Sequence, residues 1–323
     1  AGFLLTGSGG GSTQVGYDDI FLEFQFVDGD GELQVATKGS KDMNKKFNVT
    51  GDDLFNAFGV SMGLLGVLYK CKIATVENFF MEGTEHDVEF ADSPLATAAI
   101  FRESYSKWYS LHMNWYKQGD KLNAVQVNMS NKAPVLVEGD PKFKPFHNAL
   151  RNKSLQVAAA VAIVLGNLIP SVALRAFYLK FFINPGAENA NRPFYDSWIK
   201  VLPSDNEVPV DTWFAVDFTE VWIEIDQVEE AFDILNKAFE EDPLMTGNFA
   251  VEMYAAKGCD FWLSPAVKGD VVRIDPYWFH HNLKGKPYPF FLKYWQKLLV
   301  LSGARMHWGK YIPSANEVLA DGL

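Results

Sequence analysis

The fold is decided by residues 219–239, which read TEVWIEIDQVEEAFDILNKAF. The first part, 219–225, alternates as a strand does. Asp226 with Glu229 three residues later matches a capping box, which predicts that a helix begins at this point. The apolar residues that follow recur every three or four positions, as on one face of an amphipathic helix: Val228, Ala231, Phe232, Leu235, Ala238 and Phe239.

More β-rich runs lie C-terminal to this helix, at 249–254, 259–265 and 270–275. Together with the strand at 219–225 they predict an antiparallel sheet backed by helices. A further helical run is predicted at 290–301. Earlier in the chain, the spacing of five aromatic or imidazole side chains fits one face of a helix, with helix packing favoured over a ligand wall: Trp108, Tyr109, His112, Trp115 and Tyr116.

The N-terminal part predicts a second, smaller unit. Residues 20–27 and 32–37 read as two strands joined by a turn, and a short helix starting at Asp52 leads to a strand at 68–74. A glycine-rich stretch, 7–13, precedes this hairpin. A dinucleotide-binding fingerprint needs a strand before its glycines and a helix directly after them, so this order argues against that fingerprint.

Composition excludes several classes of function. The 323 residues are 48% hydrophobic and 21% charged, as in ordinary folded proteins, and allow one large or two ordinary domains. The net charge of −11 would repel a phosphate backbone, so no nucleic-acid partner is predicted. Residues 155–174 are nearly uncharged, but Gly166, Asn167 and Pro170 interrupt them; they predict a buried or interface-lying helix, so membrane association is disfavoured but left open.

Few residues remain that could carry chemistry. The chain has no G-x-S-x-G, P-loop or H-E-x-x-H motif. The adjacent His280 and His281 would point to opposite faces of a strand, and the cysteines form no cluster, so no metal site is predicted. The glycine stretch, Glu252 and the segment 307–310 are left. A salt bridge, core packing and a solvated surface charge are the ordinary alternatives for Glu252, His307 and Lys310.

Taken in order, these features resemble the sugar-lactone and alditol oxidase branch of the vanillyl-alcohol-oxidase-type flavoproteins. Four local matches carry the resemblance: 6–12, 60–67, Glu252 with 263–265, and His-Trp-Gly-Lys at 307–310. The resemblance implies an α+β fold. A partial FAD-binding domain at 1–75 would be followed by a cap domain at 76–300, with an antiparallel sheet backed by helices, and residues 301–323 would return to the flavin.

The resemblance also implies roles for individual residues in oxidising an alcohol carbon, with electrons passed to oxygen or another acceptor. Glu252 would orient or deprotonate the substrate hydroxyl, Lys310 would stabilise negative charge near the flavin, and His307 belongs to the same catalytic signature. Tyr254 and Tyr277 would line the substrate pocket. The residues implied to line FAD are Gly7, Ser8, Gly9, Gly10, Gly11, Ser12, Gly63, Gly66 and Val67.

The chain also departs from the family pattern. The glycine stretch lacks the family's histidine, and Tyr254 stands where arginine is expected, which would remove a fixed positive charge. The first half of the flavin domain, with its pyrophosphate-binding loop, is expected outside these residues, in the same or a separate chain. Two alternatives to a sugar-lactone or polyol oxidase follow: an oxidase of a sterol-type alcohol, or a non-catalytic structural or binding subunit.

Overall fold

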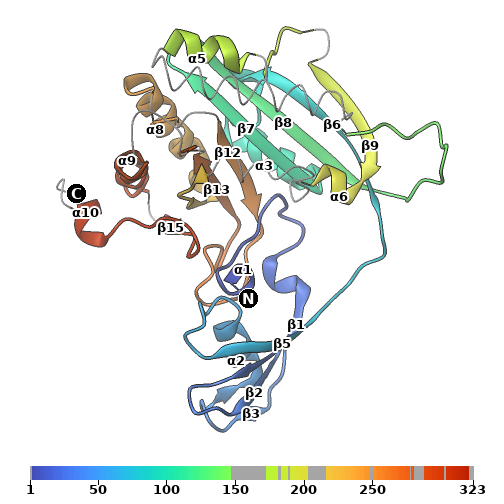
Figure 1. Ribbon diagram of the computed structural model, residues 1–323, viewed down its shortest axis with the longest axis vertical. Coiled ribbons are helices and arrows are strands. Elements are labelled where there is room, and N and C mark those ends of the chain that lie inside the picture. The colour runs from blue at the N-terminus through green and yellow to red at the C-terminus, as the bar shows by residue number, and fades with distance from the viewer. Residues whose placement is uncertain are drawn as a thin grey trace.

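The structure is a computed structural model, and it describes residues 2–146, 172–180, 183–187, 190–202, 216–243, 245–246, 250–276, 278–279, 287–301 and 303–319. The chain folds as mixed α+β, with one eight-stranded antiparallel sheet and smaller sheets (Figure 1). This confirms the predicted fold class. Within the described part of the chain, no helix has both the length and the apolar character needed to cross a membrane.

The N-terminal unit is a three-stranded sheet covered by a helix. Strand β1 (Phe21–Val27) lies between β2 (Leu33–Thr37) and β5 (Val67–Ile73), and helix α2 (Gly51–Phe58) packs on the sheet. The predicted hairpin, helix and following strand are therefore confirmed. The core of this unit is a cluster of buried phenylalanines: Phe21, Phe24, Phe26, Phe55, Phe58 and Phe261. Its shorter elements are α1 (Gly2–Leu5), η1 (Tyr17–Ile20), β3 (Met43–Asn44) and β4 (Val49–Thr50).

The large sheet has the strand order β15-β11-β13-β12-β7-β8-β6-β9. Its strands are β6 (Phe80–Glu89), β7 (Ser110–Gln118), β8 (Leu122–Ala133), β9 (Asn191–Ser197), β11 (Val221–Glu224), β12 (Val251–Ala256), β13 (Val271–Pro276) and β15 (Arg305–Met306). Helices α3 (Ala98–Lys107), α8 (Val228–Glu241) and α9 (Tyr288–Leu298) contribute buried side chains to a core on one face. Figure 1 shows α8 and α9 beside β12 and β13. The remaining elements are η2 (Phe90–Asp92), α5 (Val172–Leu179), α6 (Trp198–Val201), β10 (Val216–Asp217), η3 (Ile225–Gln227), β14 (Trp278–Phe279) and α10 (Ala315–Leu319).

Helix α8 has the predicted apolar face but not the predicted start. All six apolar residues named above are buried. The helix begins at Val228, after the single turn η3, and makes no side-chain cap. Asp226 instead forms an ion pair with Arg102 at 2.7 Å, and the Glu229 carboxylate accepts a hydrogen bond from the Ala98 N–H. The capping-box prediction is therefore wrong, because tertiary partners take both carboxylates.

The aromatic segment is a strand rather than the predicted helix face. Residues 110–118 form β7, which pairs with β8 on one side and β12 on the other. Leu111, Met113 and Trp115 face the helix-covered core, so the relevant period is two. The β-rich run 259–265 is also not a strand; it lies in the β12–β13 connection and places Phe261 in the phenylalanine cluster. The predictions for 155–171, His280 and His281 lie outside the described residues.

Candidate functional site

The face of the large sheet opposite its helix-covered core carries polar side chains in matched positions on neighbouring strands. Directly paired residues of antiparallel strands point to the same side of a sheet. Two rows of paired residues result, and we call them together the polar face: Arg273, Tyr254, His112, Asn128, Glu85 and Arg192 in one row, and Asp275, Glu252, Asn114, Gln126 and Asp87 in the other. The members on the central strands β7 and β8 are partly exposed, and there a ligand would meet the hydrogen-bonding groups of His112, Asn114, Gln126 and Asn128.

The glycine stretch lies against one end of the polar face. The Gly11 N–H donates to the Ala255 carbonyl at 2.7 Å, and the Gly11 carbonyl accepts from the Leu111 N–H at 2.9 Å. The stretch therefore inserts between the ends of β12 and β7. Gly10 has a φ of 131°, and a Cβ there would stand 3.0 Å from Cδ of Arg273. Glycine is required at this position because the backbone conformation and the close approach both exclude a side chain.

His307 links the glycine stretch to the C-terminal segment. Its Nε2 lies 2.9 Å from Oγ of Ser8, and its Nδ1 accepts a hydrogen bond from the Gly309 N–H at 3.0 Å. Burial, reinforced by the positive charges of Lys310 and Arg273, lowers the pKa of His307 to about 4. The ring is therefore neutral at pH 7, with its proton assigned to Nε2, which donates to Ser8. These contacts favour a positioning role for His307.

Arg273 is the central charge of this cluster. Its guanidinium donates to the Gly9 carbonyl at 2.8 Å, to Glu220 at 3.0 Å and to Asp275 at 2.9 Å. It also lies over the ring of Tyr254, 4.5 Å from the centroid. The β12–β13 register places this guanidinium directly opposite Tyr254. Glu220 and Asp275 both bind it, so it does not restore the net positive charge that the sequence leaves out at Tyr254.

Two buried carboxyl groups share this one guanidinium. Glu220 and Asp275 are each about 1% exposed, and the indole N–H of Trp222 donates to Glu220. Burial and the repulsion from Glu220 raise the pKa of Asp275 well above its ordinary value. In the described part of the chain, Oδ1 of Asp275 and Nε of Arg273 have no hydrogen-bond partner. The cluster therefore retains a free donor and a free acceptor out of contact with water.

Glu252 lies in the adjacent row and is bound by an imidazole. Its Oε1 is 2.9 Å from Nε2 of His112, whose ring stacks on Tyr254 at 4.5 Å with an interplanar angle of 7°. Burial would raise the pKa of Glu252, but its hydrogen bonds to His112 and Tyr254, the charge of His112 when that ring is protonated, and the charge of Arg273 outweigh burial and hold the pKa at about 2. A carboxylate this acidic takes a proton poorly at neutral pH. The geometry therefore favours orientation over deprotonation as its role.

The other predicted site residues are placed less closely. The backbone N–H of Lys310 donates to the His307 carbonyl at 3.1 Å, and its Nζ lies 4.1 Å from the centroid of the Phe218 ring. The turn that contains Gly63 and Gly66 packs at the other end of β1, where a Cβ on Gly66 would collide with the Val27 carbonyl. Val67, the first residue of β5 after this turn, is 74% exposed. The structure does not bring this turn to the polar face. Tyr277 lies outside the described residues.

These side chains suit one end of a flavin. The ring of a flavin gains negative charge when it is reduced, and the cation of Lys310 suits that charge. The charge of Arg273 is already bound by Glu220 and Asp275, and its Nε is buried. The glycine stretch does not offer comparable room for the phosphates of FAD. The cavity beside Gly7, Gly9 and Gly10 measures about 20 Å³, which is room for about one water molecule. The described residues therefore fit the polar edge of the ring and offer no cradle for a pyrophosphate. Among those same residues, no group of three or more His, Cys, Asp or Glu side chains could hold a metal ion.

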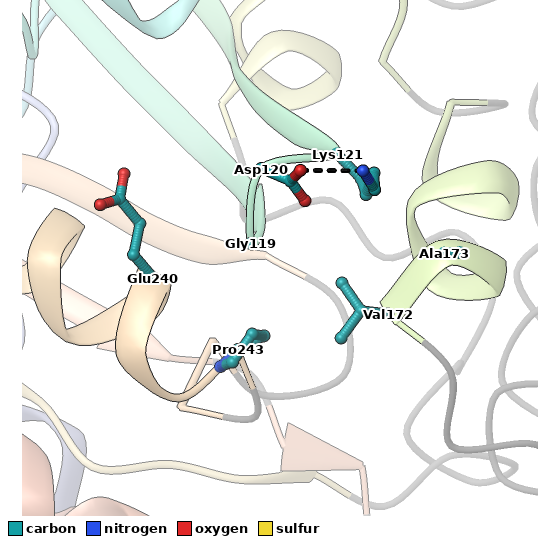
Figure 2. Close-up of a pocket in the computed structure, with 7 residues that line it drawn as sticks. All are labelled: Gly119, Asp120, Lys121, Val172, Ala173, Glu240 and Pro243. Carbon is teal, nitrogen blue, oxygen red and sulfur yellow. Dashed lines mark hydrogen bonds and ion pairs between the residues drawn. The ribbon is translucent and has the colours of Figure 1, made fainter.

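A larger cleft of about 630 Å³ lies away from the predicted site residues, between the β7–β8 turn, the start of α5 and the end of α8 (Figure 2). Its charged groups are already paired: Asp120 with Lys121 at 2.8 Å, and Glu240 with Lys117 at 3.1 Å. Val172 gives it an apolar wall. Among the described residues that line it, the acid–base groups are held in these ion pairs and there is no serine, cysteine or histidine, so the polar face remains the candidate site.

Comparison with known proteins adds no assignment. No protein-family model matches the chain, and no curated protein sequence matches it significantly. Function must therefore be argued from the site itself and from the four local motifs.

Proposed function

We propose that this chain forms the substrate side of an FAD-dependent oxidoreductase that oxidises an alcohol carbon of a sugar lactone or polyol. The observation that carries the proposal is convergence at one end of the polar face. Ser8 of the glycine stretch contacts His307, 299 positions away, and Gly11 pairs with Ala255 beside Tyr254. Three of the four motifs behind the family resemblance thus meet at one place.

Each residue then has a physical role. The bound flavin would accept the hydride from the alcohol carbon. Lys310 would provide positive charge where negative charge develops. Arg273, whose charge is bound by Glu220 and Asp275, would hold the glycine stretch through its hydrogen bond to the Gly9 carbonyl. Glu252, ionised and held by His112, would orient the substrate hydroxyl. Gly7–Ser12 would approach the cofactor through backbone groups because no side chain intervenes at the glycines. Oxygen or another acceptor would then take the electrons.

The polar face favours a hydroxylated substrate over a sterol. Asn114, Gln126 and Asn128 all lie on it and are partly exposed. Covering such groups with an apolar ring system would remove them from water without replacing their hydrogen bonds, which costs about 1–3 kcal/mol for each group. Substrate hydroxyls would replace those bonds. The sterol-type alternative is therefore the weaker one.

The proposal includes further protein around the cofactor. The small cavity beside the glycine stretch leaves the adenine and pyrophosphate without a site among the described residues. We therefore propose that the missing half of the flavin domain, from the same or a separate chain, supplies that site. Intact-mass analysis of the flavin-containing species tests this point, because a homogeneous 36.3 kDa monomer that binds FAD would contradict it.

A non-catalytic binding subunit is the second candidate. The close packing of the glycine stretch against β12 and Arg273 favours it, because this backbone already uses several of its hydrogen-bonding groups. The visible spectrum of the natively purified protein, with any polypeptide that copurifies, separates the two candidates. Bound flavin that is bleached anaerobically by a sugar lactone or an alditol supports the oxidoreductase. Pure protein without flavin absorbance supports the binding subunit.

A further inference from the structure

His112 lies in the middle of the polar face and has no part in the family resemblance. On β7 it stands between Asn128 of β8 and Tyr254 of β12. The stacking on Tyr254 fixes the plane of its ring, while 16% of the side chain stays exposed. The ring is thus held rigidly but is open to a small molecule on the polar face.

Glu252 determines which ring nitrogen of His112 carries the proton. An ionised carboxylate can only accept hydrogen bonds, so Nε2, 2.9 Å from Oε1, is the protonated nitrogen of the neutral ring. Nδ1 is then left with a free lone pair. Nothing in the described ranges donates a hydrogen bond to Nδ1, so a substrate hydroxyl can do so.

We propose that His112 is the general base of the reaction and that Glu252 is the residue that holds its tautomer. This inference rests on the proposed function. The substrate O–H bond breaks and its proton goes to Nδ1 of His112. The C–H bond would break with its electron pair leaving with the hydrogen, as hydride, to the flavin that the proposed function supplies as oxidant, and a carbonyl would form. The imidazolium is stabilised by the adjacent Glu252 carboxylate, and solvent at the exposed part of the ring removes the proton.

The charges around His112 suit this role. β12 supplies the negative charge of Glu252, and its Tyr254 is stacked on the ring. β8 supplies the uncharged Asn128 as the cross-strand neighbour. The cation of Arg273 lies beyond Tyr254, but Glu220 and Asp275 bind it. Glu252 is therefore the charged group in direct contact with the imidazole.

Anaerobic stopped-flow reduction of the bound flavin tests the catalytic role. His112→Asn should slow reduction about a hundredfold or more, with flavin still bound, because general-base catalysis contributes roughly 10²–10⁴. Glu252→Gln keeps the shape but offers an amide N–H to Nε2, which would reverse the tautomer, and we expect a comparable loss. His86→Asn is the matched control, because His86 points to the opposite face from Glu85 and Asp87 and should leave the rate unchanged.

Nitrogen NMR of histidine-labelled protein provides a readout that needs no turnover. The spectrum of His112, assigned by its loss in His112→Asn, should show the proton on Nε2 in the wild type and on Nδ1 in Glu252→Gln. Reduction at the wild-type rate in His112→Asn, or a proton on Nδ1 in the wild type, overturns the inference and leaves the proposed function intact. Wild-type flavin that no alcohol reduces overturns the proposed function, and the catalytic role of His112 with it.

Discussion

Replacing Arg273 by glutamine should destabilise the fold severely. The arginine side chain is 16% exposed, and its carboxylate partners, Glu220 and Asp275, are 1% and 2% exposed. Arg273→Gln removes the only cation that hydrogen-bonds these two groups in the described part of the chain. It also removes the donor to the Gly9 carbonyl and the contact with the Tyr254 ring. Two buried carboxyl groups would be left against each other.

The magnitude follows from burial. Removing one partner of a buried ion pair costs about 3–5 kcal/mol, because the remaining charge stays out of water. The pH dependence also has a definite sign. The folded-state pKa of Asp275 is already raised above its ordinary value by burial and by Glu220, so its contribution to stability is lost as pH rises through that pKa. Without the arginine the pKa would rise further, so the loss of stability should be larger at neutral pH than at acidic pH.

Urea denaturation of the purified chain at neutral and acidic pH measures this effect. Arg102→Gln is the matched control, because its ion pair with Asp226 has the same chemistry but is 47% and 79% exposed. Exposed pairs contribute about 1 kcal/mol or less, so the control should differ little from the wild type. A loss below about 1 kcal/mol in Arg273→Gln, equal to that of the control, would refute the assignment of Arg273 as the charge that neutralises the buried pair.

Three further predictions concern the residues around the glycine stretch. The pKa of His307 is about 4 in the folded protein, compared with an ordinary value of 6.5. The free energy of unfolding should therefore fall by roughly 3 kcal/mol as pH drops from 6.5 to 4, and His307→Gln should reduce this pH dependence in denaturation experiments. Gly10→Ala should cost about 1–3 kcal/mol in thermal unfolding, because φ is 131° and Cδ of Arg273 is 3.0 Å from the new Cβ, whereas Gly29→Ala, with open space around it, should be nearly neutral. Lys310→Met should keep the fold but slow flavin reduction about a hundredfold in stopped-flow experiments, and an unchanged rate would assign Lys310 as a surface charge.

The sequence predicted those parts of the fold whose signals are local. The apolar face of α8, the β1–β2 hairpin and β5 all follow from periodicity and turn residues, and the structure confirms them. Prediction failed where contacts with residues distant in sequence determine the secondary structure or the hydrogen-bond partner. The spacing of residues 108–116 fits a helix as well as a strand, and only the neighbours β8 and β12 select the strand. The Asp226 carboxylate had two possible partners, and Arg102 of α3 is the one it binds.

In the candidate site, too, the residues that a local motif identifies could be predicted, and those that long-range pairing brings in could not. Glu252, His307 and the glycine stretch could be identified because motifs mark them, and the structure brings them to one end of the polar face. No sequence motif identifies Arg273. It lies 19 residues after Tyr254 on another strand, and no spacing rule predicts that the two residues pair. In the sequence His112 is one of several ring-bearing residues, and only the register of β7 against β12 reveals its partnership with Glu252.

A short motif stands for a spatial arrangement, and the resemblance proposed for this chain would require the two to separate. A Glu-x-Arg pattern places a carboxylate and a guanidinium two residues apart on the same side of one strand. Here the guanidinium belongs to Arg273, which lies on the neighbouring strand directly opposite Tyr254, the residue two positions after Glu252. The Tyr254 ring packs against that guanidinium. Side chains of paired residues on antiparallel strands lie about as close as those two apart on one strand, so the positive charge can change strands while staying near its place. The cost is that the arginine must be neutralised locally. Glu220 and Asp275 do this, and they also make Arg273 the residue on which both the fold and the proposed chemistry depend.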